Sequence, residues 1–168
     1  VGMGEIGREV ARLCTVFGTQ IGYFGPNRKP VDYSYFQDLM ELAGWADVLV
    51  VACPGGKSTQ GLVSASVLDE LGPQGILINI ARGSVIDEQA LVERLVSGSI
   101  AGAGLDVFAD EPHIPEQLRY LDNVVLQPHL GSATDRTRRK MGDLTLDNVA
   151  AYFEGRPLIT PVPLKHFL

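Results

Sequence analysis

Short, continuously apolar runs alternate along this chain with segments that carry an apolar residue at every third or fourth position. Apolar runs of about four to eight residues are typical of strands that are covered on both faces of a sheet. We expect strands over residues 20–24, 47–53, 75–80, 100–107 and 123–126, the fourth of them rich in glycine.

The segments between these runs have the spacing of amphipathic helices. The first carries Ile6, Val10, Leu13, Cys14 and Phe17 on one side, and further helices are expected over residues 34–44, 66–71, 87–97 and 134–154. Strands separated by such helices indicate a parallel sheet with right-handed crossovers. We therefore predict an α/β fold with a doubly wound, Rossmann-type sheet, whose ligands bind beyond the carboxyl ends of the strands.

The chain opens with the glycine pattern Gly2-x-Gly4-x-x-Gly7, which runs directly into the first predicted helix. In dinucleotide-binding domains these glycines allow a tight turn, a close approach of the phosphates and close packing of the helix on the strand. The helix N-terminus then presents its N–H groups to the anion. Alone, the pattern is equally compatible with a turn before an ordinary helix.

Only Val1 precedes this turn, although the turn normally follows a central strand of the sheet. Without that strand, its two neighbours would be left with unpaired edges. We therefore expect residues 1–168 to form a dinucleotide-binding domain that is truncated at its N-terminus and lacks its first strand.

Composition narrows the choice of function. The 168 residues, 45% hydrophobic and 20% charged, suit one globular domain. A net charge of −6 argues against a nucleic-acid or anionic-membrane partner, and no apolar run approaches the roughly 20 residues of a membrane span. Cys14 and Cys53 lie in apolar patterns without ligand spacing, so we interpret them as reduced thiols of a cytoplasmic protein without a metal site.

The identity of the dinucleotide depends on residues about 20 positions beyond the glycines, where NAD-binding domains carry an acidic residue. Here Asn27, Arg28 and Lys29 occupy that region, and the first carboxylate is Asp32. These three side chains could hydrogen-bond and neutralise a 2′-phosphate, which a carboxylate would repel. The pattern favours NADP over NAD, unless Arg28 and Lys29 are simply solvated loop residues.

Three loops that follow predicted strands carry candidates for chemistry. They contain Arg82, the acids Asp106 and Glu111, and His129. Each alone has a structural explanation, such as an ion pair, a solvated acid or a structural histidine. Together, a cation, an acid and a histidine at one edge of a sheet are the components of a hydride-transfer site. Neither His113 nor His166 has a comparable setting.

These segments resemble the nicotinamide-binding domain of the D-isomer-specific 2-hydroxyacid dehydrogenases. Besides the glycine pattern, the resemblance rests on residues 45–54, 78–88, 104–108, 111–112 and 128–132, and it covers essentially the whole chain. Within that family the chain is most similar to the glyoxylate, hydroxypyruvate and hydroxyphenylpyruvate reductases, through residues 23–24, 28–30, 50–54 and 157–162.

The resemblance implies a catalytic role for three residues. Arg82 would orient the carboxylate and carbonyl of the substrate, His129 would be the general acid in reduction, and Glu111 would stabilise the charged form of His129. Reduction of a 2-oxo acid needs a hydride for the carbonyl carbon and a proton for its oxygen. A histidine beside a carboxylate suits the second task whatever the family.

The resemblance also implies a set of cofactor contacts. The N–H groups of Glu5 and Ile6 would meet the pyrophosphate, Asp106 the nicotinamide carboxamide, and Cys53, Pro54, Ile80 and Ala81 would line the cofactor, with weaker assignments for Thr59, Gly131 and Ser132. The complete protein would be a homodimer, with a substrate domain built from a preceding portion of chain. The helix over residues 134–154 would pack toward that domain.

Two departures from the family pattern affect these expectations. Gly25-Pro26-Asn27 replaces the Ser-Arg-Ser-like cluster of clear NADP users. Gly55-Gly56-Lys57 replaces the Leu-Thr-type residues that usually follow the cofactor-lining proline. The first leaves fewer groups for a 2′-phosphate, and the second changes the loop over the nicotinamide.

We expect an oxidoreductase that reduces a small 2-oxo acid, glyoxylate or hydroxypyruvate first, to the D-2-hydroxy acid, with NADPH preferred and NADH possible. The isolated chain is expected to be inactive, because its substrate domain is missing. One alternative is an NAD-dependent dehydrogenase of the phosphoglycerate type. Another is a dehydrogenase-like protein that binds and senses NAD(P) without turnover.

Overall fold

The computed structural model describes residues 1–162, so His166 lies outside the described part of the chain. The chain divides into two compact units, one over Val1–His129 and one that begins at Leu130. Among the described residues, no helix is both long and apolar enough to cross a membrane.

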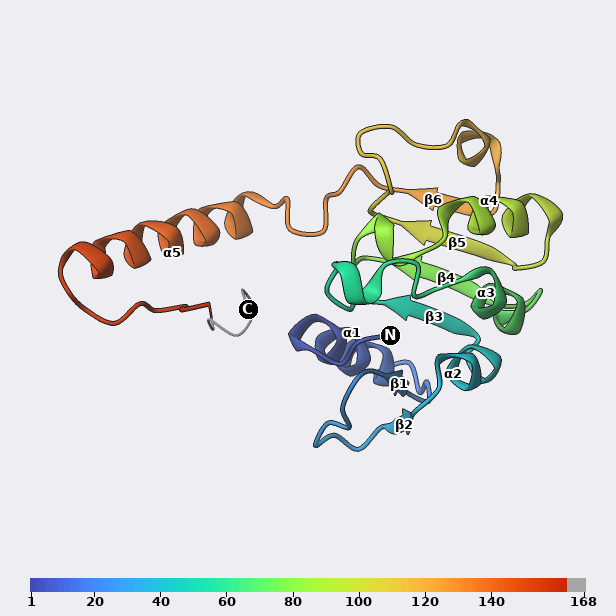
Figure 1. The fold of residues 1–168 in the computed structure, drawn as a ribbon, viewed down its shortest axis with the longest axis horizontal. Coiled ribbons are helices and arrows are strands. Elements are labelled where there is room, and N and C mark those ends of the chain that lie inside the picture. Colours follow the sequence, from blue (N-terminus) through green and yellow to red (C-terminus); the bar gives the residue numbers. More distant parts are fainter. Residues whose placement is uncertain (163–168) are drawn as a thin grey trace. The chain divides into compact units, whose positions relative to one another are not determined.

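Four parallel strands form the main sheet of the first unit (Figure 1). They are β3 (Val48–Val51), β4 (Ile76–Asn79), β5 (Gly102–Leu105) and β6 (Val124–Leu126), in that spatial order. The register places Val51 opposite Asn79 and Asn79 opposite Leu105, so the strands end together. This register confirms the predicted parallel α/β sheet. It also brings the loops that carry the candidate catalytic residues to one edge of the sheet.

A second sheet corrects one prediction. Its strands are β1 (Gly22–Phe24) and β2 (Ser34–Phe36), which pair in parallel. The sequence analysis placed residues 34–36 in a helix, because Phe36 has helical spacing from the apolar residues that follow. The helix α2 (Leu39–Trp45) begins later, where Asp38 Oδ1 accepts a hydrogen bond of 2.9 Å from the Met40 N–H. Phe36 instead contacts Trp45 from the strand, with ring centroids 5.4 Å apart.

The two sheets are joined by the first two residues and otherwise stand apart. Val1 nitrogen donates to Val50 oxygen at 2.6 Å, and Gly2 nitrogen donates to Phe24 oxygen at 2.9 Å. Beyond these contacts, a slot of about 590 Å³ is lined by residues of α1 (Glu5–Thr15), β1 and β3. Apart from the bonds of Val1 and Gly2, the hydrogen bonds described for residues 1–162 do not pair the facing edges of β1 and β3, as the sequence analysis expected.

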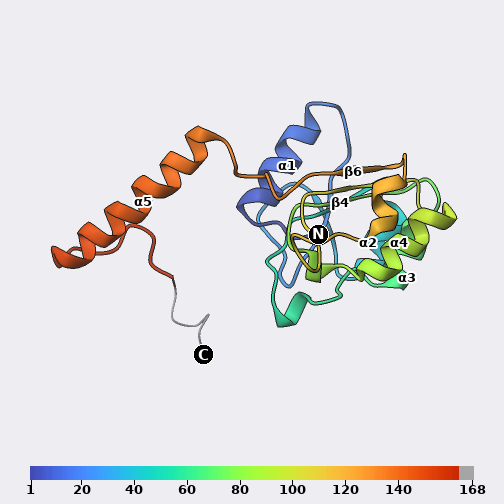
Figure 2. The same ribbon diagram turned by 90° about the horizontal axis from the view of Figure 1, so that it is seen from above.

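Helices α2, α3 (Ala65–Leu71) and α4 (Glu88–Ser97) supply the apolar core of one sheet face. Figure 2 shows α1 on the other side of the sheet from α3 and α4. The expectation that the strand over residues 47–53 is covered on both faces is wrong, because Val48 is 49% exposed on the second face. Within Val1–His129, α1 is the helix on that side, and it does not cover the whole sheet.

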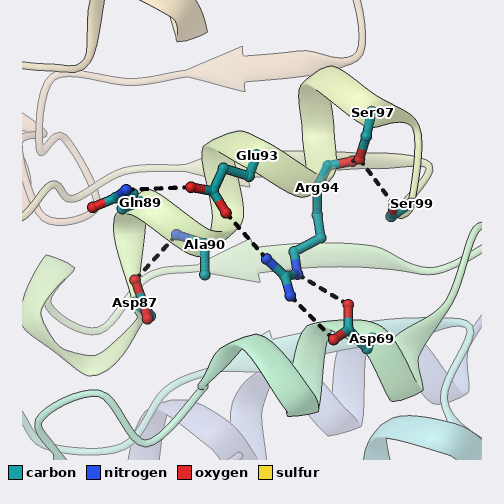
Figure 3. A network of polar contacts seen from close by, with 8 residues as sticks. All are labelled: Asp69, Asp87, Gln89, Ala90, Glu93, Arg94, Ser97 and Ser99. Atoms are coloured by element: carbon teal, nitrogen blue, oxygen red, sulfur yellow. Dashed lines mark hydrogen bonds and ion pairs between the residues drawn. The ribbon is translucent and has the colours of Figure 1, made fainter.

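Both ends of α4 carry residues that are typical of helix ends, and its bounds match the helix expected over residues 87–97. Asp87 Oδ1 accepts a hydrogen bond of 3.1 Å from Ala90 N–H, and Gly98 closes the helix with a φ of +72°. Figure 3 shows how Arg94 then ties this helix to α3. Its Nε and Nη2 atoms lie 3.0 and 3.1 Å from the two carboxylate oxygens of Asp69.

Three short 3₁₀ helices were not anticipated: η1 (Lys57–Thr59), η2 (Gly83–Val85) and η3 (Glu116–Tyr120). The last, η3, lies in the segment between the expected strands over residues 100–107 and 123–126. Leu118 is buried at 1% exposure, and this single apolar anchor holds η3 on the core.

The second unit contains α5 (Asp135–Phe153), which matches the predicted helix. Thr134 caps it by accepting a hydrogen bond from Thr137 N–H at 3.2 Å. Asn148 Oδ1 accepts the N–H groups of Ile159 and Thr160 at 3.0 and 3.1 Å, so the segment after the helix folds back along it. Within the described helix, Ala151 is the residue that is buried.

Candidate active site

The turn after β4 is built around a buried polar side chain. Asn79 is 1% exposed, and its Oδ1 accepts the Ala81 N–H at 3.0 Å while its Nδ2 donates to the Arg82 carbonyl at 3.1 Å. A buried amide is stable only when such partners satisfy it. Asn79 thus fixes the backbone that carries Arg82. The sequence analysis assigned it no role, although an amide at the end of an apolar strand was a usable signal.

The loops after β4 and β5 touch at a glycine. A Cβ on Gly83 would lie 1.9 Å from the carbonyl carbon of Phe108, so no side chain fits there. This contact brings Arg82, one residue earlier, next to the segment that leads to Glu111. Arg82 itself is exposed, and its Nη1 donates to the Ala81 carbonyl at 2.6 Å.

Glu111 and His129 form the centre of the site. Glu111 Oε2 lies 2.8 Å from His129 Nδ1, and Glu111 Oε1 accepts the Phe108 N–H at 3.0 Å. The hydrogen bond from His129, the Phe108 N–H and the charges of His129 and Arg82 hold the pKa of Glu111 below its usual value. The structure therefore brings together the three predicted catalytic residues.

The backbone of His129 is unusual. Its φ is +56°, which puts a residue other than glycine in the left-handed region. Such a conformation costs about 1 kcal/mol or more and is found preferentially at functional sites. The imidazole is 46% exposed and borders a hollow of about 430 Å³. The lining residues are Phe108, Glu111, Pro112, Ile114, Arg119, Leu126, Gln127, Pro128 and His129.

The glycine turn fits a dinucleotide. Gly2 has a φ of +89°, and a Cβ there would lie 2.8 Å from the Cys53 backbone; one on Gly7 would collide with the Gly2 carbonyl. A Cβ on Gly4 would meet no atom within 4 Å, and no side chain caps α1. Two glycines therefore make the turn compact, and the third leaves open space before the helix N-terminus. That is the cradle a pyrophosphate needs, with the Glu5 and Ile6 N–H groups at its base.

The remaining predicted cofactor residues surround the strand ends. Cys53 and Pro54 follow β3, Ile80 and Ala81 follow β4, and Asp106 follows β5. Burial raises the pKa of the Cys53 thiol, which keeps it protonated. Thr59 Oγ1 donates to the Pro54 carbonyl at 2.7 Å and so stabilises the turn itself.

Gly131 and Ser132 belong to the second unit, and their roles stay predictions. Within residues 1–162, no group of three or more histidine, cysteine or acidic residues is placed to hold a metal ion.

A family model described as the NAD-binding domain of D-isomer-specific 2-hydroxyacid dehydrogenases matches residues 1–131. The chain belongs to this family. It is 49% identical over 163 residues to hydroxyphenylpyruvate reductase of Plectranthus scutellarioides and 47% identical over 163 residues to glyoxylate/hydroxypyruvate reductase A of Arabidopsis thaliana. Each match covers 96% of this chain and 52% of the relative, so the chain spans about half the length of these curated relatives.

A solved structure of this dehydrogenase family has the same fold. It is the NADPH-dependent glyoxylate/hydroxypyruvate reductase of Sinorhizobium meliloti in complex with NADP and malonate. It superposes with a TM-score of 0.93 at 46% identity, over 96% of this chain and 51% of the other. The Rossmann-type domain predicted from the glycine turn and the strand pattern is thus confirmed.

In this chain, the loop after β1 carries the residues that are predicted to select the dinucleotide. Asn27 and Arg28 are exposed, and Lys29 is half-buried. Among the ion pairs of residues 1–162, none involves Arg28 or Lys29, so both cations remain available to an anion. This is the charge balance expected for a 2′-phosphate site.

Proposed function

We propose that the protein containing this chain reduces a small 2-oxo acid to the D-2-hydroxy acid with NADPH, and that glyoxylate and hydroxypyruvate are its first candidate substrates. The observation that supports the proposal is the distance of 2.8 Å between His129 Nδ1 and Glu111 Oε2. The positive charge of Arg82 acts on the same carboxylate. The names of the Plectranthus and Arabidopsis relatives support the same substrate class.

Under this proposal each side chain has its own task. NADPH, when bound, supplies the hydride that reduces the carbonyl carbon. His129 faces Glu111 through Nδ1, which leaves Nε2 to donate a proton to the carbonyl oxygen. Glu111 fixes the orientation of the ring through the hydrogen bond to Nδ1. The guanidinium of Arg82 is a planar, forked cation that suits the substrate carboxylate.

The preference for NADPH rests on the loop after β1. Asn27, Arg28 and Lys29 supply hydrogen-bond donors and positive charge, and no carboxylate occurs before Asp32. The S. meliloti relative, described as NADPH-dependent, supports this preference. NADH remains the second candidate cofactor.

Steady-state kinetics of the full-length polypeptide test the proposal. We expect NADPH oxidation with glyoxylate and hydroxypyruvate, and a kcat/KM for NADPH at least about tenfold above that for NADH. A clear preference for NADH would favour the phosphoglycerate-type dehydrogenase instead. Tight NADPH binding without turnover of any 2-oxo acid would favour a sensing protein.

We also propose that the complete protein is a cytoplasmic homodimer and that α5 packs toward the substrate domain. Leu146 and Phe153 of α5 are 68% and 82% exposed, and Phe17 beyond α1 is 84% exposed. Apolar surface of this kind is typical of faces that another domain or subunit covers. Light scattering of the full-length protein tests the dimer, and cell fractionation tests the location.

A further inference from the structure

Two tyrosine hydroxyls hold the loop that carries the predicted 2′-phosphate residues. The Lys29 N–H donates to Tyr23 oxygen at 2.7 Å, and the Tyr23 hydroxyl lies 3.3 Å from the Lys29 carbonyl. The Tyr35 hydroxyl donates to the Gly25 carbonyl at 3.0 Å. Tyr23 thus fixes the end of the 25–29 loop, and Tyr35 fixes its beginning.

The tyrosines themselves are held firmly by the sheet below the loop. Tyr23 lies in β1 and is 1% exposed, and Tyr35 lies opposite it in β2. Their ring centroids are 5.2 Å apart, and both pack in the small apolar cluster around Met3 and Ala11. The two hydroxyls therefore belong to paired strands and bond to a loop that has no regular secondary structure.

Core packing alone does not explain two tyrosines here. A phenylalanine would fill the same volume, and a buried hydroxyl costs free energy unless it is hydrogen-bonded. All of the hydrogen bonds described for these hydroxyls go to the backbone of Gly25 and Lys29. The function that the hydroxyls add is therefore to fix the path of the loop between those residues.

A fixed loop matters most for a ligand that the loop itself must bind. Asn27 and Arg28 are exposed and lie between Gly25 and Lys29, the two residues that the tyrosines hold. Without these hydrogen bonds, the side chains would have to be ordered when the dinucleotide binds. Ordering a loop in advance removes that entropic cost from the binding step.

We propose that Tyr23 and Tyr35 are positioning residues that set the preference for NADP over NAD by preorganising the 25–29 loop around the 2′-phosphate. They act through the loop, because their hydroxyls bond to its backbone. This inference rests on the proposed NADPH preference.

The test is the affinity of the full-length protein for NADP⁺ and NAD⁺, measured by titration calorimetry. In a Tyr23→Phe/Tyr35→Phe double variant we expect NADP⁺ affinity to fall about tenfold or more and NAD⁺ affinity to change less than about twofold. Tyr35→Phe alone, at a half-buried position, should weaken NADP⁺ binding about threefold, and it keeps the test usable if the double variant does not fold. Tyr120→Phe, at a side chain that is 76% exposed, is the matched control and should change neither affinity.

A second measurement separates positioning from general stability. In an Arg28→Ala background, the tyrosine substitutions should lose most of their effect on NADP⁺ affinity, because the group they position is gone. Equal losses of NADP⁺ and NAD⁺ affinity, or an undiminished effect without Arg28, would overturn the inference while the proposed function stands. A wild-type protein that binds neither dinucleotide, or prefers NAD⁺, would overturn both.

Discussion

Gly55 lies directly against the side chain of Arg82. A Cβ built on Gly55 would be 2.6 Å from Arg82 Cγ and 3.0 Å from Arg82 Cβ. The glycine that replaces the Leu-Thr-type residues of the family therefore lies against the side chain of Arg82, the predicted substrate-orienting residue. The position of the guanidinium depends on the absence of a side chain at residue 55.

Gly55→Ala should move Arg82 and weaken substrate binding more than cofactor binding. We expect the KM for the 2-oxo acid to rise and kcat/KM to fall about tenfold or more, because small displacements of a positioning group are costly. The affinity for NADPH should stay within about twofold of the wild type. Gly142→Ala, at a helical position where a Cβ meets no atom within 4 Å, is the control. An unchanged KM in Gly55→Ala would contradict this account.

His129→Asn should separate folding from catalysis. Asparagine tolerates the left-handed conformation that His129 adopts, with its φ of +56°, so we expect the melting temperature to change by no more than about 2–3 °C. Loss of the proton donor should lower kcat by about 10²–10⁴-fold. Calorimetry and steady-state kinetics measure the two effects. A variant that unfolds, or one that keeps its activity, would show that His129 has a different role.

The lowered pKa of Glu111 predicts how its contribution to stability depends on pH. Because the pKa in the folded state lies below the ordinary value of 4.5, the ionised carboxylate stabilises the fold at pH values above 4.5. This contribution is lost as the pH falls through the folded-state pKa. The stability difference between the wild type and Glu111→Gln should therefore be greatest above pH 4.5 and shrink below it. Urea denaturation across the acid range measures it, and a difference that grows below pH 4.5 would refute the assignment.

Asn79→Leu should damage the turn that carries Arg82. The substitution keeps the approximate volume but leaves the Ala81 N–H and the Arg82 carbonyl without their partner, at a cost of about 1–3 kcal/mol. We expect a lower free energy of unfolding together with a higher KM for the 2-oxo acid. Leu77→Met, a substitution of similar volume at a fully buried position of the same strand, is the control for the core alone. If both variants behave alike, Asn79 has no special role at the turn.

Much of this fold could be predicted from local signals. The glycine pattern, the helix over residues 87–97 and the apolar runs each depend on nearby residues, and the structure confirms them. The prediction for residues 34–36 failed because Phe36 has helical spacing from Leu39 and Met40, although its partner in the fold is Trp45. Pairing with β1 overrides that local periodicity, and no local pattern reports it.

The residues of the candidate site could be chosen from the sequence, but the contacts that position them could not. Arg82, Glu111 and His129 could be chosen because each follows a strand of one parallel sheet. The contact of Gly55 with Arg82 joins two loops that are far apart in the sequence, and no local pattern reports it. The hydrogen bond from the Lys29 N–H to Tyr23 is local, but it depends on the path of an irregular loop that the spacing of residues does not predict.

The configuration of the product is the sharpest test of the proposed reduction to a D-2-hydroxy acid. The full-length protein would be incubated with NADPH and hydroxypyruvate, and the glycerate that forms would be separated on a chiral column. We expect D-glycerate, with NADPH consumed in equal amount, and almost none in the His129→Asn variant. L-glycerate, or full activity without His129, would contradict it.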